Sequence, residues 1–184
     1  MKKLTIALAL LAMTLGANAQ TTPTPEFKNK VMLVDKSNAL TDLEKTDLTT
    51  SLKTNMGGHS EVNIVADGKA ATLMNSGSPA EKFIVKIEPG VDPETVVELF
   101  TFDVAKKVRK ILVAQMSMGK DQAVTLTKVK LNYTKIADGV YAVSVKEQLP
   151  EGQYCFLVNR PNITIMGSAS AQSLIGYCFG VAGK

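Results

Sequence analysis

The chain has 184 residues and a nearly balanced charge, with 21 Lys and Arg against 17 Asp and Glu. This balance gives no argument for binding nucleic acid or an acidic membrane surface, and we expect no nucleic-acid partner. The length fits one domain of ~100–200 residues. Because the chain has no Trp, and only 4 Tyr and 6 Phe, its core must rely on aliphatic side chains and Met.

Residues 1–19 are predicted to be a signal peptide. Two lysines precede a short apolar run over 4–15, and Ala-Asn-Ala at 17–19 supplies a cleavage site with small residues. The apolar run is shorter than the ~20 residues that cross a bilayer, so we expect no stable membrane span. We therefore expect cleavage near Ala19 and a periplasmic or secreted product. The Met-Lys-Lys opening indicates a Gram-negative origin.

Residues 20–60 are predicted to form a linker and an N-terminal extension. The Thr-Pro stretch over 20–25 has nothing to bury, and the alternating pattern of FKNKVMLVDK predicts a first strand within 27–36. We expect a short helix over 41–46 and then a strand over 47–54, because the Thr-rich composition favours extended chain.

From Glu61 onward, short alternating runs are separated by turn signals about every 8–12 residues, which is the pattern of an antiparallel sandwich or barrel. No helical pattern of the length that a parallel crossover needs interrupts them. The predicted fold is all-β, an antiparallel immunoglobulin-like β-sandwich over 61–184, with a β-bulge near Lys128. Its roughly nine strands are expected within 61–68, 69–75, 81–87, 95–104, 107–115, 123–136, 140–147, 149–158 and 174–181.

Two Tyr-Cys-Phe triplets stand near the C-terminus, at 154–156 and 177–179. In a strand, each cysteine points to the face opposite its aromatic neighbours. If the two strands are antiparallel neighbours, both aromatic rows enter one core and both cysteines share the other face.

Cys155 and Cys178 are therefore a disulfide candidate. Two cysteines in an exported chain favour a bridge, and closing this loop would stabilise the fold by roughly 3 kcal/mol. The alternative is a pair of free thiols packed as small apolar groups. A catalytic cysteine needs a base, and the single histidine, His59, has no sequence tie to either cysteine.

Gly152 and Tyr154 are predicted to form a structural corner, in which the tyrosine hydroxyl bonds back to the backbone. The run LPEGQYCF resembles the Leu-x-Pro-Gly-Glu-Tyr-x-Phe strand of uncharacterised secreted bacterial immunoglobulin-like β-sandwich proteins. The later Tyr-Cys-Phe-Gly is similar to the strand that closes their domain. Here Glu151 stands between Pro150 and Gly152, which alters the order. The resemblance implies a sandwich of unassigned role and carries over no catalytic residue.

The sequence contains no HExxH, GxSxG, P-loop, GxGxxG or CxxC motif. We therefore expect no catalytic residue, no cofactor and no metal. Two charged groups are predicted to be solvated faces: the acidic residues Asp35, Asp42, Glu44 and Asp47, and the basic patch of Lys106, Lys107, Arg109 and Lys110.

The leading functional hypothesis is an exported, non-enzymatic interaction or structural module that binds an unknown protein or envelope component. Loops bind partners in many rigid sandwiches, and the Ser-rich loop over 168–173 and the tip over 116–121 are the expected contact regions. One alternative is a carboxylate-dependent hydrolase or glycan-active accessory domain using Glu94 and Glu98. The other is a binder of small apolar ligands between the sheets.

Overall fold

The computed structural model describes residues 23–117, 120–122, 126–161 and 174–183. The predicted signal peptide and the 168–173 loop lie outside these residues. Strands dominate the described chain, and all of their described pairings but one are antiparallel, so the all-β prediction is confirmed. The short helix α1 (Pro93–Val96) begins where Asp92 accepts a hydrogen bond from the Glu94 amide at 3.0 Å. In the described part of the chain, no helix combines the length and the apolar character needed to cross a membrane.

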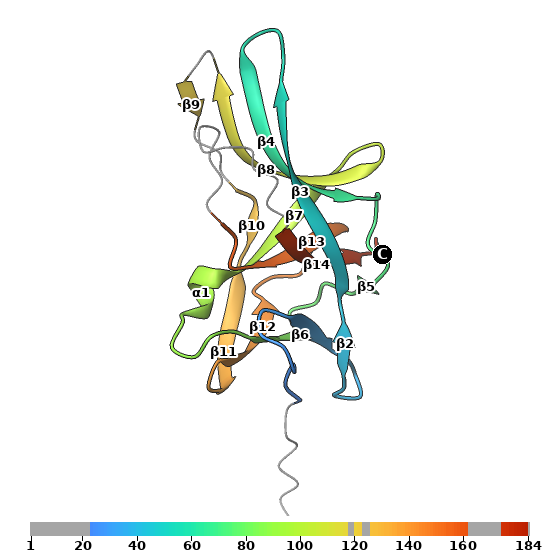
Figure 1. Ribbon diagram of the computed structural model, residues 1–184. Helices are drawn as coiled ribbons and strands as arrows, with labels where there is room; N and C mark the ends of the chain where they lie inside the picture. The colour runs from blue at the N-terminus through green and yellow to red at the C-terminus, as the bar shows by residue number, and fades with distance from the viewer. Residues whose placement is uncertain (1–22, 118–119, 123–125, 162–173, 184) are drawn as a thin grey trace, which may run out of the picture.

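One layer is a five-stranded sheet, drawn in the lower part of Figure 1. Its strands, in spatial order, are β11 (Leu131–Ala137), β12 (Val140–Val145), β6 (Lys82–Lys86), β1 (Val31–Val34) and β2 (Leu40–Asp42). The register of β11 against β12 shifts between Lys135 and Ala137. The β-bulge predicted near Lys128 is not found there: Lys128 and Val129 pair with the larger sheet and Leu131 begins β11, so the change of face marks the passage from one sheet to the other.

The second sheet is larger, and part of it closes on itself. In spatial order it contains β10 (Lys128–Val129), β7 (Val97–Val104), β13 (Gly152–Val158), β14 (Leu174–Val181), β3 (Glu44–Thr54), β4 (His59–Asp67), β8 (Val108–Ser117) and β9 (Lys120–Gln122). A short strand β5 (Met74–Asn75) runs parallel to β14. Because β7 also pairs with β8, six strands from β7 round to β8 form a closed ring. Strands β3, β4 and β8 continue beyond this ring as a projecting arm (Figure 1).

The strands β7, β13 and β14 have two buried faces because they belong to both cores. Tyr154, Phe156 and Phe179 pack toward the five-stranded sheet. Cys155 and Cys178 point the other way, into the interior of the ring. One core therefore lies between two layers and the other inside the ring.

The N-terminal region differs most from the prediction. Residues 41–46 form no helix, because β2 and β3 occupy 40–42 and 44–54. The alternation of Glu44, Thr46 and Leu48 explains this result, since the three side chains share a face and Leu48 is fully buried. The stretch 31–54, assigned to an extension, lies within both sheets, and the strand expected over 69–75 is reduced to β5. Where the sequence predicted two stacked antiparallel layers, the structure has an open five-stranded sheet and a second sheet that closes into a ring.

Candidate functional site

The two cysteines lie side by side in the ring. Strands β13 and β14 are antiparallel neighbours, which is the condition under which the two cysteines were expected to share a face, and Cys155 stands directly opposite Cys178 in their register. Both residues are fully buried free thiols, and their Sγ atoms are 3.3 Å apart. We use the name ring cluster for these cysteines together with Thr46, Glu44 and Arg109.

Glu44 and Arg109 form a buried ion pair beside the cysteines. The Nη2 group of Arg109 donates to Glu44 Oε1 at 2.9 Å and to the Asp67 carbonyl at 3.1 Å. Only 2% of the Arg109 side chain and 18% of the Glu44 side chain are exposed. The interpretation of both residues as members of solvated charged faces is therefore wrong. Strand alternation could have found them, because Arg109 shares a face with the buried Ile111 and Glu44 shares one with Leu48.

The Arg109 guanidinium has more buried hydrogen-bond donors than the ring cluster has acceptors. Within the described part of the chain, Nε and Nη1 of Arg109 are buried and have no hydrogen-bond partner. The guanidinium lies 5.4 Å from the centre of the Phe102 ring, which partly offsets this deficit. The cluster is thus a charge-balanced Arg109–Glu44 pair in an otherwise apolar interior, with two guanidinium nitrogens left without acceptors among the described residues.

The two thiols differ in acidity because their surroundings differ. Burial raises the pKa of Cys155 well above its ordinary value. The hydrogen bond with Cys155 lowers the pKa of Cys178, and the contact with Thr46 and the charge of Arg109 also lower it. Burial and the charge of Glu44 act to raise it but do not outweigh these effects. Cys178 is therefore the sulfur that ionises first.

Glycine at position 176 makes room for this pair. A Cβ atom there would overlap the Cys155 sulfur and lie 2.8 Å from Leu48 Cδ1. We expect Gly176→Ala to lower the free energy of unfolding by about 1–3 kcal/mol, because overpacking a filled core forces its neighbours to move. Chemical denaturation should show this loss, and Cys155→Ala in the same background should recover part of it.

The control for this substitution is Gly57→Ala in the exposed β3–β4 turn. There the nearest atom to an added Cβ is His59 Cδ2 at 3.4 Å, and we expect little change in stability. An equal loss in both glycine variants would contradict the packing argument.

The predicted corner residues Gly152 and Tyr154 lie at the start of β13. The Tyr154 hydroxyl donates to the Pro150 carbonyl at 2.9 Å, and its ring stacks on Phe179 with the ring centres 5.5 Å apart. Tyr154 thus ties the turn before β13 to the core between the sheets.

The carboxylates considered for hydrolysis have other roles. Glu98 pairs with Arg160 at 2.8 Å and with Lys128 at 2.5 Å. Burial acts to raise its pKa, but hydrogen bonds from both cations hold it below the ordinary value. A general acid needs the opposite shift. Glu94 lies on α1, and the described residues include no group of three or more potential metal ligands.

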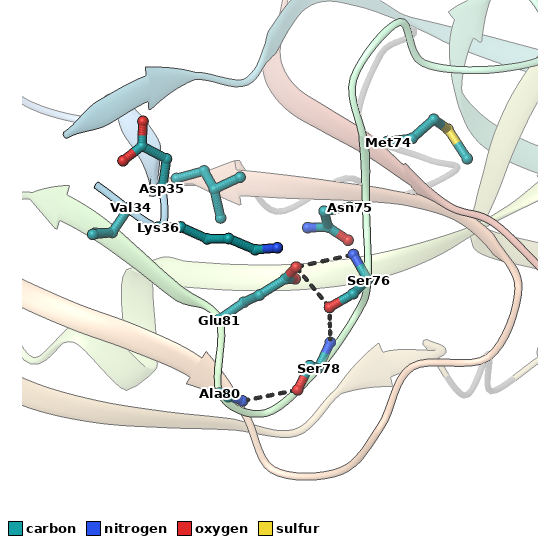
Figure 2. Close-up of a pocket in the computed structure, with 10 residues that line it drawn as sticks. Val34, Asp35, Lys36, Met74, Asn75, Ser76, Ser78, Ala80 and Glu81 are labelled. Carbon is teal, nitrogen blue, oxygen red and sulfur yellow. Dashed lines mark hydrogen bonds between the residues drawn. The ribbon is translucent and has the colours of Figure 1, made fainter. Parts of the chain in front are cut away.

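A surface pocket of about 450 Å³ lies between the end of β1 and the segment joining β5 to β6. We call it the Met74 pocket. Its apolar lining comes from Leu33, Val34, Met74 and Ala80, and its polar lining includes Lys36, Asn75 and Glu81. Figure 2 shows the Lys36 side chain reaching across the pocket toward Asn75 and Glu81. Because it joins segments far apart in the chain, no local sequence signal identifies it.

Hydrogen bonds hold the walls of the Met74 pocket in place. Glu81 Oε1 accepts from the Ser76 amide at 2.9 Å and from its hydroxyl at 2.7 Å (Figure 2). On the opposite wall, Asp35 Oδ1 accepts from the amides of Ser37 and Ala39 at 2.8 and 2.9 Å. The pocket is therefore preorganised.

Gly77 anchors one wall to the core. Its φ of 64° is in the left-handed region, and an added Cβ would lie 2.8 Å from Leu149 Cβ. The Leu149 amide also donates to the Gly77 carbonyl at 2.9 Å. This wall thus has little freedom to adapt.

Comparisons with known proteins name no relative: no protein-family model, no curated protein and no solved structure matches this chain. A function for this chain must therefore be inferred from the geometry of the ring cluster and of the Met74 pocket.

Proposed function

We propose that the protein is an exported, non-enzymatic binding module that docks a segment of another envelope protein in the Met74 pocket. Export rests on the leader pattern over 1–19, and the immunoglobulin-like relationship on the LPEGQYCF resemblance and the core between the sheets. The observation that carries the binding role is a rigid surface pocket with an exposed apolar residue: 47% of Met74 is accessible, although its sulfur lies over Gly180.

The lining of the pocket indicates the kind of segment that it fits. The pocket has an apolar wall for one side chain, formed by Leu33, Val34 and Met74. Among the described residues, the Lys36 ammonium forms no ion pair. An extended segment could place an apolar side chain against this wall and a neighbouring carbonyl or carboxylate oxygen beside the Lys36 ammonium.

The two alternative functions find less support. A hydrolase would need a carboxyl group free to exchange protons, whereas Glu98 is held ionised by two cations. An apolar ligand between the sheets would have to displace a packed aromatic cluster, in which Phe83 lies 4.9 Å from Phe156 and 5.3 Å from Phe179 between ring centres.

Site-specific photo-crosslinking in cells tests the binding role. We expect a benzophenone amino acid at position 74 to yield a discrete adduct with an envelope protein, and Lys36→Glu to abolish it. The matched control is position 104, since Val104 is 53% exposed but lies at the β7–β8 turn. The same adducts at both positions, or none at position 74, would contradict the proposal. Hydrolysis of a model glycan that is lost on Glu94→Gln or Glu98→Gln would favour the enzymatic alternative.

A further inference from the structure

Cys155 and Cys178 stand at directly opposite positions of the antiparallel pair β13–β14. Such positions place Cα atoms about 4.5–5.5 Å apart, within the range of about 4.4–6.8 Å that a disulfide requires. The Sγ atoms are already 3.3 Å apart and need to approach by about 1 Å to bond. The backbone is therefore compatible with both the dithiol and the disulfide.

The residues around the two cysteines hold their sulfur atoms close to each other and away from solvent. Both are fully buried. A Cβ at Gly176 would overlap Cys155 Sγ, so the glycine leaves the space that this sulfur occupies. The guanidinium of Arg109 lies in the same interior: Nη2 donates to Glu44, while Nε and Nη1 are buried without a partner among the described residues. The charge of Arg109 acts to lower the pKa of Cys178 and the charge of Glu44 acts against it, and the net shift is downward, which favours the thiolate that exchange requires.

We propose that Cys155 and Cys178 are a reversible redox pair that forms a disulfide across β13 and β14 when a disulfide oxidant of the glutathione class is present. The disulfide would link β13 covalently to β14, two strands that contribute to both cores. This inference does not depend on the Met74 pocket or its partner.

The chemistry balances in two exchanges. The Cys178 thiolate attacks one sulfur of glutathione disulfide, so a mixed disulfide forms and one glutathione thiolate leaves and takes up a proton. The Cys155 thiol then loses its proton and attacks Cys178 Sγ, which releases the second glutathione. The protein loses two protons and two electrons, and glutathione disulfide gains both to become two glutathione thiols.

Burial makes the exchange dependent on motion of the fold. Neither sulfur is exposed, so the oxidant reaches Cys178 only when β14 separates locally from its neighbours. We expect oxidation of the native protein to be slow and to accelerate in mild denaturant, and reduction by dithiothreitol to show the same dependence.

Redox titration of the purified protein tests the pair. The reduced protein is equilibrated with glutathione buffers of increasing oxidised fraction, unfolded in acid, alkylated and weighed by intact mass spectrometry. We expect a single transition to a species lighter by two hydrogens with no alkylated thiol, which dithiothreitol reverses. Cys155→Ala and Cys178→Ala should each show only glutathione adducts or one alkylated thiol.

A second measurement keeps the test independent of how far the variants fold. We expect the oxidised wild-type protein to unfold at a higher temperature than the reduced protein, and reduction to restore the lower midpoint. The proposal fails if wild-type protein keeps two alkylatable thiols in every buffer, including buffers containing denaturant. It also fails if oxidation yields only mixed or intermolecular disulfides.

Discussion

Arg109→Met is expected to lower the free energy of unfolding by about 3 kcal/mol, the lower end of the range for breaking a buried ion pair by removing one partner. Methionine fills much of the space but leaves the Glu44 carboxylate without its cation. The effect is at the lower end because Glu44 keeps 18% exposure and still accepts the Thr72 amide at 2.5 Å. Urea denaturation at neutral pH measures the loss.

The double variant Arg109→Met/Glu44→Gln is the matched control. Glutamine keeps the shape of glutamate without its charge, so we expect it to recover part of the lost stability. If the double variant loses as much as the sum of the two single variants, the ion pair does not account for the effect.

The ion pair also sets a pH dependence with a defined sign. Burial acts to raise the pKa of Glu44, but hydrogen bonds from Arg109 and Thr72 hold it below the ordinary 4.5. A carboxyl group whose pKa is lowered by folding stabilises the protein above its unfolded pKa, and this contribution is lost as the pH falls through the folded value. Wild-type stability should therefore fall below about pH 4.5 more steeply than that of Arg109→Met.

Local alternation was sufficient to predict which faces of β13 and β14 carry the aromatic and the sulfur side chains, under the condition that the two strands are antiparallel neighbours. The triplets at 154–156 and 177–179 place aromatic and sulfur side chains on opposite faces, and the observed register puts Tyr154 opposite Phe179 and Cys155 opposite Cys178. The same kind of signal, repeated along the chain, predicted the all-β class. Both are properties of short segments, which period-2 patterns report directly.

Closure of the ring could not be predicted in this way, because it depends on which distant strands meet. Strand β3 pairs with the C-terminal strand β14, and β4 pairs with β8, so the ring joins segments that are far apart in the chain. The charged residues in β3 favoured a solvated interpretation, although Glu44 lies opposite Cys178 within the ring. A run of charged residues in the sequence reports only the composition of that segment, whereas the burial of one of its side chains depends on the strands that pair with it.

Phe179→Ala is expected to cost about 3–5 kcal/mol of stability, because it opens a cavity in the core between the sheets. Phe179 is fully buried, and its ring centre lies 5.3, 5.5 and 6.0 Å from those of Phe83, Tyr154 and Phe156. The same substitution at Phe27, which is 61% exposed, should change stability by less than about 0.5 kcal/mol. Denaturant titration monitored by tyrosine fluorescence compares the two variants.

This variant also tests whether the two cores form one cooperative unit. Phe179 and Cys178 are adjacent in β14 and point into different cores. Because β7, β13 and β14 contribute to both cores, loss of packing in one should release the other, so Cys178 should react with a thiol reagent in the same transition that tyrosine fluorescence reports. Thiol protection that persists beyond that transition would mean that the ring retains its structure without the core between the sheets.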